Sequence, residues 1–151
     1  MDNEAPHGTM ARSARWRSKT TAARLALLGG VFGAHRFYLR GARDAPGFLH
    51  WPATLVGLWG LWRAVQFGLA DRGAELALPL LGVSVGAALF QAVLIGLCPD
   101  ARWDARWNPH AARRSASGWG AVLVVMVALL SGTAALMGTL AFALQRLFAG
   151  A

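Results

Sequence analysis

The residues with the most evident chemistry stand together in the stretch GGVFGAHRFYLRG, residues 29 to 41. A histidine and an arginine directly follow an apolar run, and two aromatic residues follow them. Two glycines precede them in the GxxxG spacing that lets a second membrane helix approach closely. The candidate turn motif comprises Gly29, Gly33, His35, Arg36, Phe37 and Tyr38. This pattern predicts a tightly packed helix end with a cation and aromatic anchors at a membrane interface.

Three roles for this motif follow from its chemistry. His35 and Arg36 can bond the carbonyls freed at a helix end, where the helix dipole favours a cation by about 0.3–1 kcal/mol. Alternatively, Arg36 and the aromatic residues present a surface to a protein or lipid partner. A third role is a proton or ion pathway through His35, His50 and Arg63, because ionisable groups at membrane depth often mark such pathways. The sequence leaves the three interpretations open.

Signatures of catalysis are missing from the sequence. It contains no HExxH pair, no phosphate-binding glycine loop and no nucleophile elbow. The single cysteine, Cys98, excludes an intramolecular disulfide and a thiolate-cluster metal site. The seven acidic residues all lie outside the apolar runs, so paired carboxylates would have to come from loops. We therefore expect no enzymatic activity, no cofactor and no metal.

The composition is that of a membrane protein. Hydrophobic residues make up 56% of the chain and charged residues 15%, against about 25% charged residues in an average globular domain. Two uncharged runs, Leu76–Cys98 and Trp119–Leu144, each exceed the ~20 residues that a helix needs to cross a bilayer. A chain of this length cannot bury two such helices in a soluble core. The expected fold class is an all-α integral membrane protein.

The apolar runs predict about four transmembrane helices. The first two form a short hairpin within residues 20–69: a helix over Thr20–Leu39, and a tryptophan-rich helix over Gly47–Trp62. The third helix spans residues 76–98 and the fourth spans residues 119–146. A polar interfacial linker, residues 99–118, joins these two, and residues 1–19 form a disordered, basic juxtamembrane segment.

The basic residues point to anionic lipid headgroups and not to nucleic acid, because they flank the apolar runs instead of forming a basic domain. Those expected to face headgroups are Arg12, Arg15, Lys19, Arg102 and Arg106. The repeat DARWDARW places two arginines and two tryptophans on adjoining stripes of a short interfacial helix. An alternating four-helix topology puts eight of the 15 lysines and arginines on the side of the termini and seven on the other. That split does not determine the orientation.

Residues 17–68 resemble the TM2 domain family. The resemblance rests on a basic lead-in, a short glycine-containing first helix, the turn His35–Leu39 and a second helix rich in tryptophan. Two positions depart from the family pattern: Arg40 replaces its usual glycine, and Arg63 stands where the family commonly has an aspartate. The resemblance implies a membrane hairpin but little biochemistry.

We expect a multi-pass protein of the cytoplasmic membrane that acts as an adaptor or accessory subunit. It contacts another membrane component through the turn His35–Tyr38, and its partners are the lipid bilayer and either a membrane protein or a second copy of the chain. The alternative is a small channel or transporter subunit. The third and fourth helices offer few polar residues to line a pore, which weakens this alternative.

Overall fold

The structure, a computed structural model, describes residues 16–149, and these are helical apart from short connections. The elements are α1 Lys19–Gly29, η1 Gly30–Phe32, α2 Ala34–Arg40, α3 Ala45–Phe48, α4 His50–Phe67, α5 Arg72–Leu97, α6 Asp100–Trp107 and α7 Trp119–Ala149. The predicted all-α class is confirmed for these residues. The expectations for residues 1–15, including Arg12 and Arg15, lie outside the described residues.

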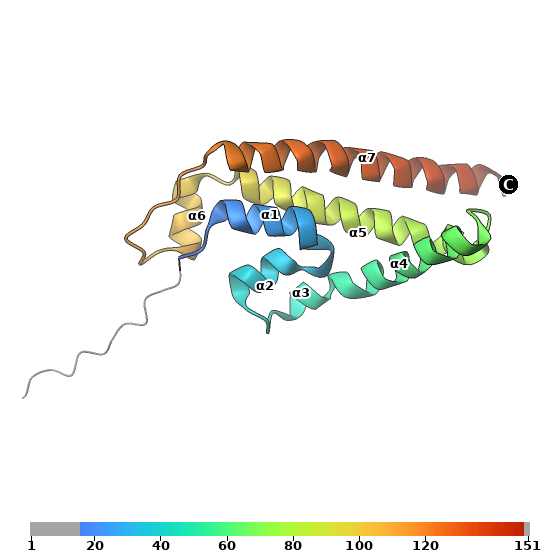
Figure 1. The fold of residues 1–151 in the computed structure, drawn as a ribbon, viewed down its shortest axis with the longest axis horizontal. Helices are drawn as coiled ribbons and strands as arrows, with labels where there is room; N and C mark the ends of the chain where they lie inside the picture. The colour runs from blue at the N-terminus through green and yellow to red at the C-terminus, as the bar shows by residue number, and fades with distance from the viewer. Residues whose placement is uncertain (1–15, 150–151) are drawn as a thin grey trace, which may run out of the picture.

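Two long helices, α5 and α7, run antiparallel along the molecule (Figure 1). At 1.5 Å per residue they extend roughly 39 and 46 Å. Their mean hydropathies are 2.2 and 2.3, and among the described helices these two are long and apolar enough to cross a membrane. In the apolar 18-residue stretch of each helix, only 33% (α5) and 22% (α7) is buried within the protein. The core helix of a soluble domain would be mostly buried, so these two helices do not fit that description. They correspond to the third and fourth predicted spans.

Two shorter helices share the remaining face of α5. Gly30, at the end of α1, lies against Ala88 in the second half of α5, whereas Gly57 and Gly60 of α4 lie against its first half, at Leu81 and Ala77. Between them, α2 turns back toward the end of the molecule that carries α6 (Figure 1). α1 and α4 therefore cover α5 in succession, and α1 reaches only part of the length of the bundle.

The single helix expected over Thr20–Leu39 does not form, because the chain turns at Gly33. This residue has φ +73°, and its N–H donates to the carbonyl of Gly30. Such a left-handed glycine is the usual way to end a helix. A Cβ at Gly33 would also lie 2.5 Å from the carbonyl oxygen of Gly47, so both the conformation and the space require glycine.

The predicted GxxxG face is wrong for the same reason. Gly29 and Gly33 lie on opposite sides of the η1 turn and do not form one stripe of a helix. The close approach to α5 is made instead by Gly30, where a Cβ would lie 2.8 Å from that of Ala88.

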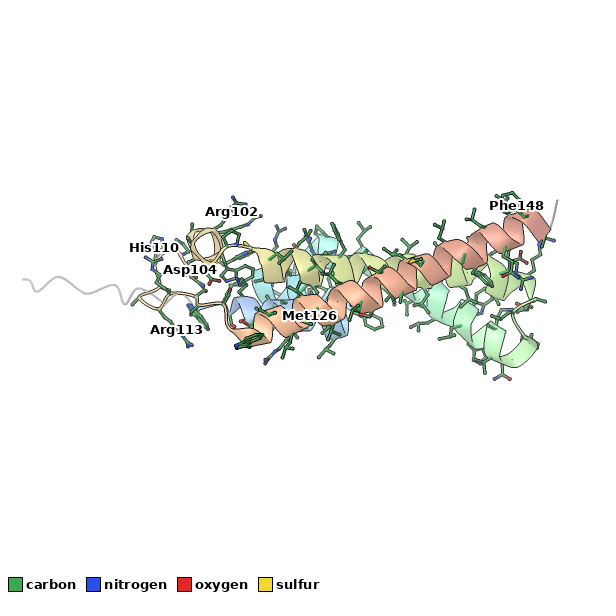
Figure 2. All side chains as sticks on the ribbon, turned by 90° about the horizontal axis from the view of Figure 1, so that it is seen from above. Arg102, Asp104, His110, Arg113, Met126 and Phe148 are labelled. Atoms are coloured by element: carbon green, nitrogen blue, oxygen red, sulfur yellow. The ribbon has the colours of Figure 1, made fainter. Side chains whose placement is uncertain are left out.

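The core is built from small side chains, as expected where helices must pack without a hydrophobic driving force from lipid. One cluster joins α1, α5 and α7 through residues Ala23, Ala26, Leu89, Ala92, Val93, Val124, Val125 and Ala128. Larger apolar side chains, including Met126 and Phe148, point outward along the bundle (Figure 2). Arg102, Asp104, His110 and Arg113 gather at the α6 end in the same view. The molecule thus has an apolar length and a polar end.

The described chain begins at the α6 end and finishes at the opposite end (Figure 1). This differs from the topology behind the eight-to-seven division of basic residues, which placed both termini together. In the structure, three of the described cations lie at the α4–α5 end, namely Arg63, Arg72 and Arg146. The other ten lie toward the α6 end, namely Arg17, Lys19, Arg24, Arg36, Arg40, Arg43, Arg102, Arg106, Arg113 and Arg114. The distribution is strongly asymmetric because α2 returns toward the end where α1 began.

Candidate functional site

The side chains of the HRFY motif, His35–Tyr38, each contact a different segment of the protein. His35 is buried on α2 and its Nε2 is hydrogen-bonded to Oε1 of Gln91 on α5. Arg36 donates from Nε to Oδ2 of Asp44 at 2.7 Å, across the α2–α3 loop. This guanidinium holds the pKa of the Asp44 carboxyl below its usual range. The two polar residues of the motif thus tie α2 to α5 and close its own loop.

The two aromatic residues complete the anchoring. The Phe37 ring lies so close to Gly47 that a Cβ there would be 2.6 Å from its Cε1, and it packs on Phe48 with ring centroids 4.9 Å apart. The hydroxyl of Tyr38 accepts a hydrogen bond from the N–H of Ser18 at 3.0 Å, and its carbonyl accepts one from Nη1 of Arg17 at 2.8 Å. These contacts support a structural role for the motif, although Arg36 pairs with a carboxylate and does not cap helix carbonyls.

The loop that follows the motif, residues 40–43, lies on the surface. Residues Arg40, Gly41, Ala42 and Arg43 are all exposed. Arg40 is 3.6 Å from Asp44, and its side chain is 44% exposed. The HRFY motif therefore holds a basic loop in place while its own side chains are largely occupied.

A polar cluster lies beneath the motif, between α2, α4 and α5. Gln91 bridges the two histidines, with its Nε2 3.5 Å from Nε2 of His50, and the histidine ring centroids are 6.5 Å apart. Nearby, Thr54 donates to the carbonyl of Val31 at 2.8 Å. Ser84 must then donate to Thr54, 2.6 Å away, because a hydroxyl has one proton to give.

Arg63 does not join this cluster. It forms two hydrogen bonds of 2.6 Å with Asp71 at the α4–α5 end, and the Asp71 carboxylate also caps α5 by accepting from the N–H of Ala74 at 2.9 Å. These interactions hold the pKa of Asp71 far below its usual range. The three residues expected to form a proton or ion pathway are therefore only partly brought together. His35 and His50 are linked through Gln91, whereas Arg63 pairs with Asp71 at the α4–α5 end. Arg36 and Arg63 do not meet, as expected.

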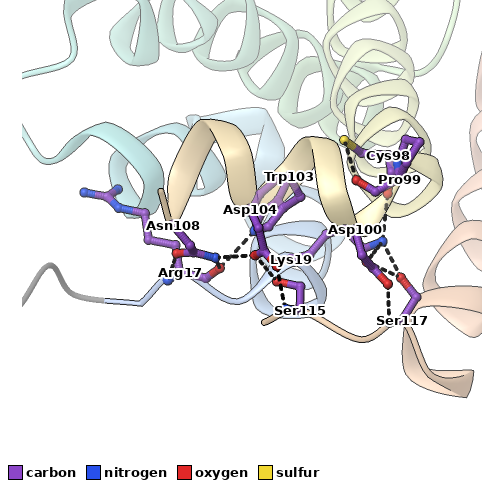
Figure 3. A network of polar contacts seen from close by, with 10 residues as sticks. All are labelled: Arg17, Lys19, Cys98, Pro99, Asp100, Trp103, Asp104, Asn108, Ser115 and Ser117. Carbon is purple, nitrogen blue, oxygen red and sulfur yellow. Dashed lines mark hydrogen bonds and ion pairs between the residues drawn. The ribbon is translucent and has the colours of Figure 1, made fainter. Parts of the chain in front are cut away.

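A second network fixes α6 to the start of the described chain (Figure 3). Lys19 donates to the carbonyl of Cys98 at 2.8 Å and pairs with Asp100 at 2.5 Å, and it also contacts Ser117. Lys19 is 4% exposed, so it does not face lipid headgroups as its sequence position had suggested. The reason is that the α5–α6 corner supplies both a carbonyl and a carboxylate at its ammonium group.

Asp104 anchors the other half of this network. It accepts from Nδ2 of Asn108 at 2.9 Å, and from both the N–H and the hydroxyl of Ser115 at 2.7 Å. Asn108 in turn accepts from the N–H of Arg17 at 2.8 Å and donates to its carbonyl at 3.1 Å. Hydrogen bonds hold the pKa of Asp104 below its usual range. The Asp104 carboxylate and the Asn108 side chain therefore both serve to hold α6 against neighbouring segments.

The repeat DARWDARW forms α6, but its tryptophans face the protein. Trp103 is 3% exposed and donates from Nε1 to the carbonyl of Arg17 at 2.9 Å. Trp107 packs beside it, with ring centroids 5.9 Å apart. Arg102 and Arg106 are exposed, and the guanidinium carbon of Arg106 lies 5.5 Å from the centre of the Trp107 ring. The two arginines thus remain accessible to headgroups, while the tryptophan stripe covers α1.

The packed helices, the outward apolar side chains and the two long apolar spans indicate a helical membrane protein. The model of the TM2 domain family matches residues 16–68, so this part of the chain is similar to a TM2 domain. The match covers α1 to the end of α4, so α5, α6 and α7 lie beyond it. No curated protein and no solved structure matches the chain.

Proposed function

We propose that this protein is a multi-pass component of the cytoplasmic membrane that acts, without catalysis, as an adaptor or accessory subunit. It contacts another membrane component through the loop that the HRFY motif supports, residues 40–43. The observation that carries this proposal is that the side chains of the motif make internal contacts, whereas the loop beside it is exposed. Four side chains bind four internal segments, and the adjoining loop keeps its cations exposed on a fixed base.

The proposed topology has three crossings, by α4, α5 and α7, in place of four. α1 and α2 enter from the α6 side and return to it. The 18 residues of α4 extend about 27 Å, close to the roughly 30 Å of a hydrocarbon core. With ten described cations toward the α6 end and three at the other, the positive-inside rule places the α6 end in the cytoplasm.

The partner chemistry follows from the charge of the loop. Arg40 and Arg43 are exposed, and Asp44, the acidic residue beside them, already pairs with Arg36. Two copies of such a loop repel each other, which disfavours a direct contact between the loops of two copies of the chain. An acidic cytoplasmic surface of a neighbouring membrane protein is the complementary partner.

Purification in mild detergent of the wild-type chain and two charge-reversed variants tests this proposal. Arg43→Glu lies in the loop, and Arg102→Glu is a matched exposed arginine on α6. We expect one co-purifying membrane protein to be lost with Arg43→Glu and kept with Arg102→Glu. A photo-crosslinking residue at position 42 should link to that same protein. Equal recovery with both variants would contradict the assignment of the loop.

The alternative function, a small channel or transporter subunit, is favoured by one observation: the cluster of His35, Gln91 and His50, in which His35 is buried and the other two are half-buried. Against a continuous path, Gly57 and Gly60 bring α4 into direct contact with α5 beyond it. Ion or proton flux in liposomes that Gln91→Leu abolishes would favour this alternative. Flux that is the same in empty liposomes would exclude it.

A further inference from the structure

We propose that the cavity between α2, α5 and α6 is a binding site for the phosphate headgroup of an anionic phospholipid. The cavity has a volume of about 220 Å³. Its lining combines four polar side chains, called the polar side below, with four apolar ones, called the apolar side; the polar ones are His35, Arg36, Arg40 and Gln91. The inference rests on the membrane orientation proposed above, with the α6 end at the cytoplasmic leaflet, and does not require the accessory role.

The polar side carries an excess of positive charge. Asp44 is the carboxylate within reach of the two lining arginines, at 2.7 Å from Arg36 and 3.6 Å from Arg40. Arg36 uses Nε of its guanidinium group for the hydrogen bond to Asp44. The two terminal nitrogens of that guanidinium group can bind a phosphate oxygen. One carboxylate cannot neutralise two guanidinium groups, so the site attracts an anion.

Two further cations flank the cavity wall at Trp107. The guanidinium carbon of Arg17 lies 6.0 Å from the centre of the Trp107 ring, and that of Arg106 lies 5.5 Å from it.

The apolar side distinguishes a lipid from a soluble anion. Leu39, Leu94, Ile95 and Trp107 line it, and Leu94 is itself 53% exposed. Leu94 continues into an exposed apolar strip of α5 with Phe90 and Leu97. The cavity is smaller than the roughly 300 Å³ at which drug-sized ligand sites begin. It therefore fits a headgroup, with the acyl chains lying along the strip.

The location agrees with this ligand. The cavity lies where α2 returns toward α6, at the end of the molecule that carries ten of the described cations. By the positive-inside rule this end faces the cytoplasmic leaflet, whose anionic lipids attract basic groups at about 1 kcal/mol per cation. The site therefore combines positive charge, an apolar wall and a position at the level of the lipid headgroups.

Native mass spectrometry of the full chain in detergent, titrated with phosphatidylglycerol or phosphatidylcholine, tests the site. We expect the wild-type chain to prefer phosphatidylglycerol, and Arg40→Gln to weaken that binding about fivefold, which corresponds to one cation at a membrane surface. Leu94→Trp, which fills the cavity without changing charge, should weaken binding of the same lipid. Arg43→Gln removes a neighbouring exposed arginine outside the cavity and should leave the preference unchanged.

Three outcomes would overturn the proposal. Equal binding of both lipids to the wild-type chain would remove the requirement for an anion. An equal loss in Arg40→Gln and Arg43→Gln would show a diffuse surface charge instead of a site. Displacement of phosphatidylglycerol by millimolar inorganic phosphate would assign the cavity to a soluble anion. Thermal unfolding of each variant in detergent, measured alongside, confirms that the protein compared is folded.

Discussion

The ammonium of Lys19 lies 2.5 Å from Oδ1 of Asp100, which joins the first turn of α1 to the first turn of α6. The lysine side chain is 5% exposed and the aspartate 29%. A charge as buried as that of Lys19 requires a partner, because water no longer solvates it. The pair therefore makes the position of α6 depend on α1, although the two residues are far apart in the sequence.

Replacing Lys19 with methionine should lower the free energy of unfolding by about 1–3 kcal/mol. It leaves Asp100 without its cation, and this loss lies below the 3–5 kcal/mol of a fully buried pair because the carboxylate is partly exposed. Thermal unfolding in detergent measures the effect. Arg102→Met, on the exposed face of the same helix, is the control and should change stability by no more than about 0.5 kcal/mol. Equal effects would show that the ion pair contributes nothing particular.

Acid should loosen the α6 network. The hydrogen bond from Lys19, followed by those from Ser117, lowers the pKa of Asp100, and hydrogen bonds from Asn108 and Ser115 lower that of Asp104. A carboxyl with a lowered folded-state pKa stabilises the fold above its unfolded pKa near 3.9. That stabilisation is lost as the pH falls through the folded value. The unfolding temperature in detergent should therefore fall below about pH 4.

Asp104→Asn separates the contribution of this residue. The amide offers one acceptor oxygen where the carboxylate serves donors on two residues. We expect the variant to unfold at lower temperature at neutral pH and to show a shallower decline on acidification. A decline as steep as that of the wild type would mean that other groups cause the acid sensitivity.

Gly33→Ala should lower the stability of the protein more than Gly118→Ala. Gly33 has φ +73° and ψ +20°, the left-handed conformation in which a side chain costs about 1–2 kcal/mol, whereas Gly118 has no positive φ. A Cβ at Gly33 would also strike backbone, namely the Gly47 carbonyl, and nothing lies within 4 Å of one at Gly118. Unfolding temperatures of the two variants measure the difference. Similar values would show that neither the left-handed backbone of Gly33 nor its approach to Gly47 affects stability.

Alanine at Gly57 should separate α4 from α5. A Cβ there would lie 2.5 Å from the backbone nitrogen of Leu81, which cannot move aside as a side chain can. Gly138→Ala on α7 has open space around it and serves as the control. We expect the first variant to lose thermal stability in detergent by at least about 1–3 kcal/mol, the usual range for overpacking, and the second to remain unchanged.

The three-crossing topology can be tested with single cysteines in a Cys98→Ser background. Ala70→Cys lies in the exposed α4–α5 turn and Ala112→Cys in the exposed loop after α6. In intact cells, a membrane-impermeant maleimide should label position 70 and spare position 112 until the cells are lysed. The reverse pattern would invert the orientation.

Local patterns in the sequence were sufficient for several features of the structure. The lengths and apolarity of α5 and α7, and the similarity of residues 16–68 to a TM2 domain, are confirmed. The site was predicted less completely. His35–Tyr38 were identified, but their partners Gln91, Asp44 and Ser18 were not, since no spacing along the chain reveals a contact between residues 56 positions apart such as His35 and Gln91. Gly57 and Gly60, which bring α4 onto α5, were likewise missed among many glycines.

The sequence by itself therefore determined the class of protein and its longest helices, because hydropathy acts over consecutive residues and requires no partner. Only the tertiary structure decided the direction of the chain after Gly33. A left-handed glycine against the carbonyl of Gly47 sends α2 back toward α6, where a continuous helix would have gone forward. Because of that one turn, Arg36, Arg40 and Arg43 lie toward the end of the molecule where the described chain begins, and not at the opposite end. The same turn sets the direction of the later helices, so that Lys19 and Asp100 lie in the same half of the bundle and form an ion pair. The burial of the Lys19 charge depends on this contact between distant segments and could not be predicted from the residues beside it.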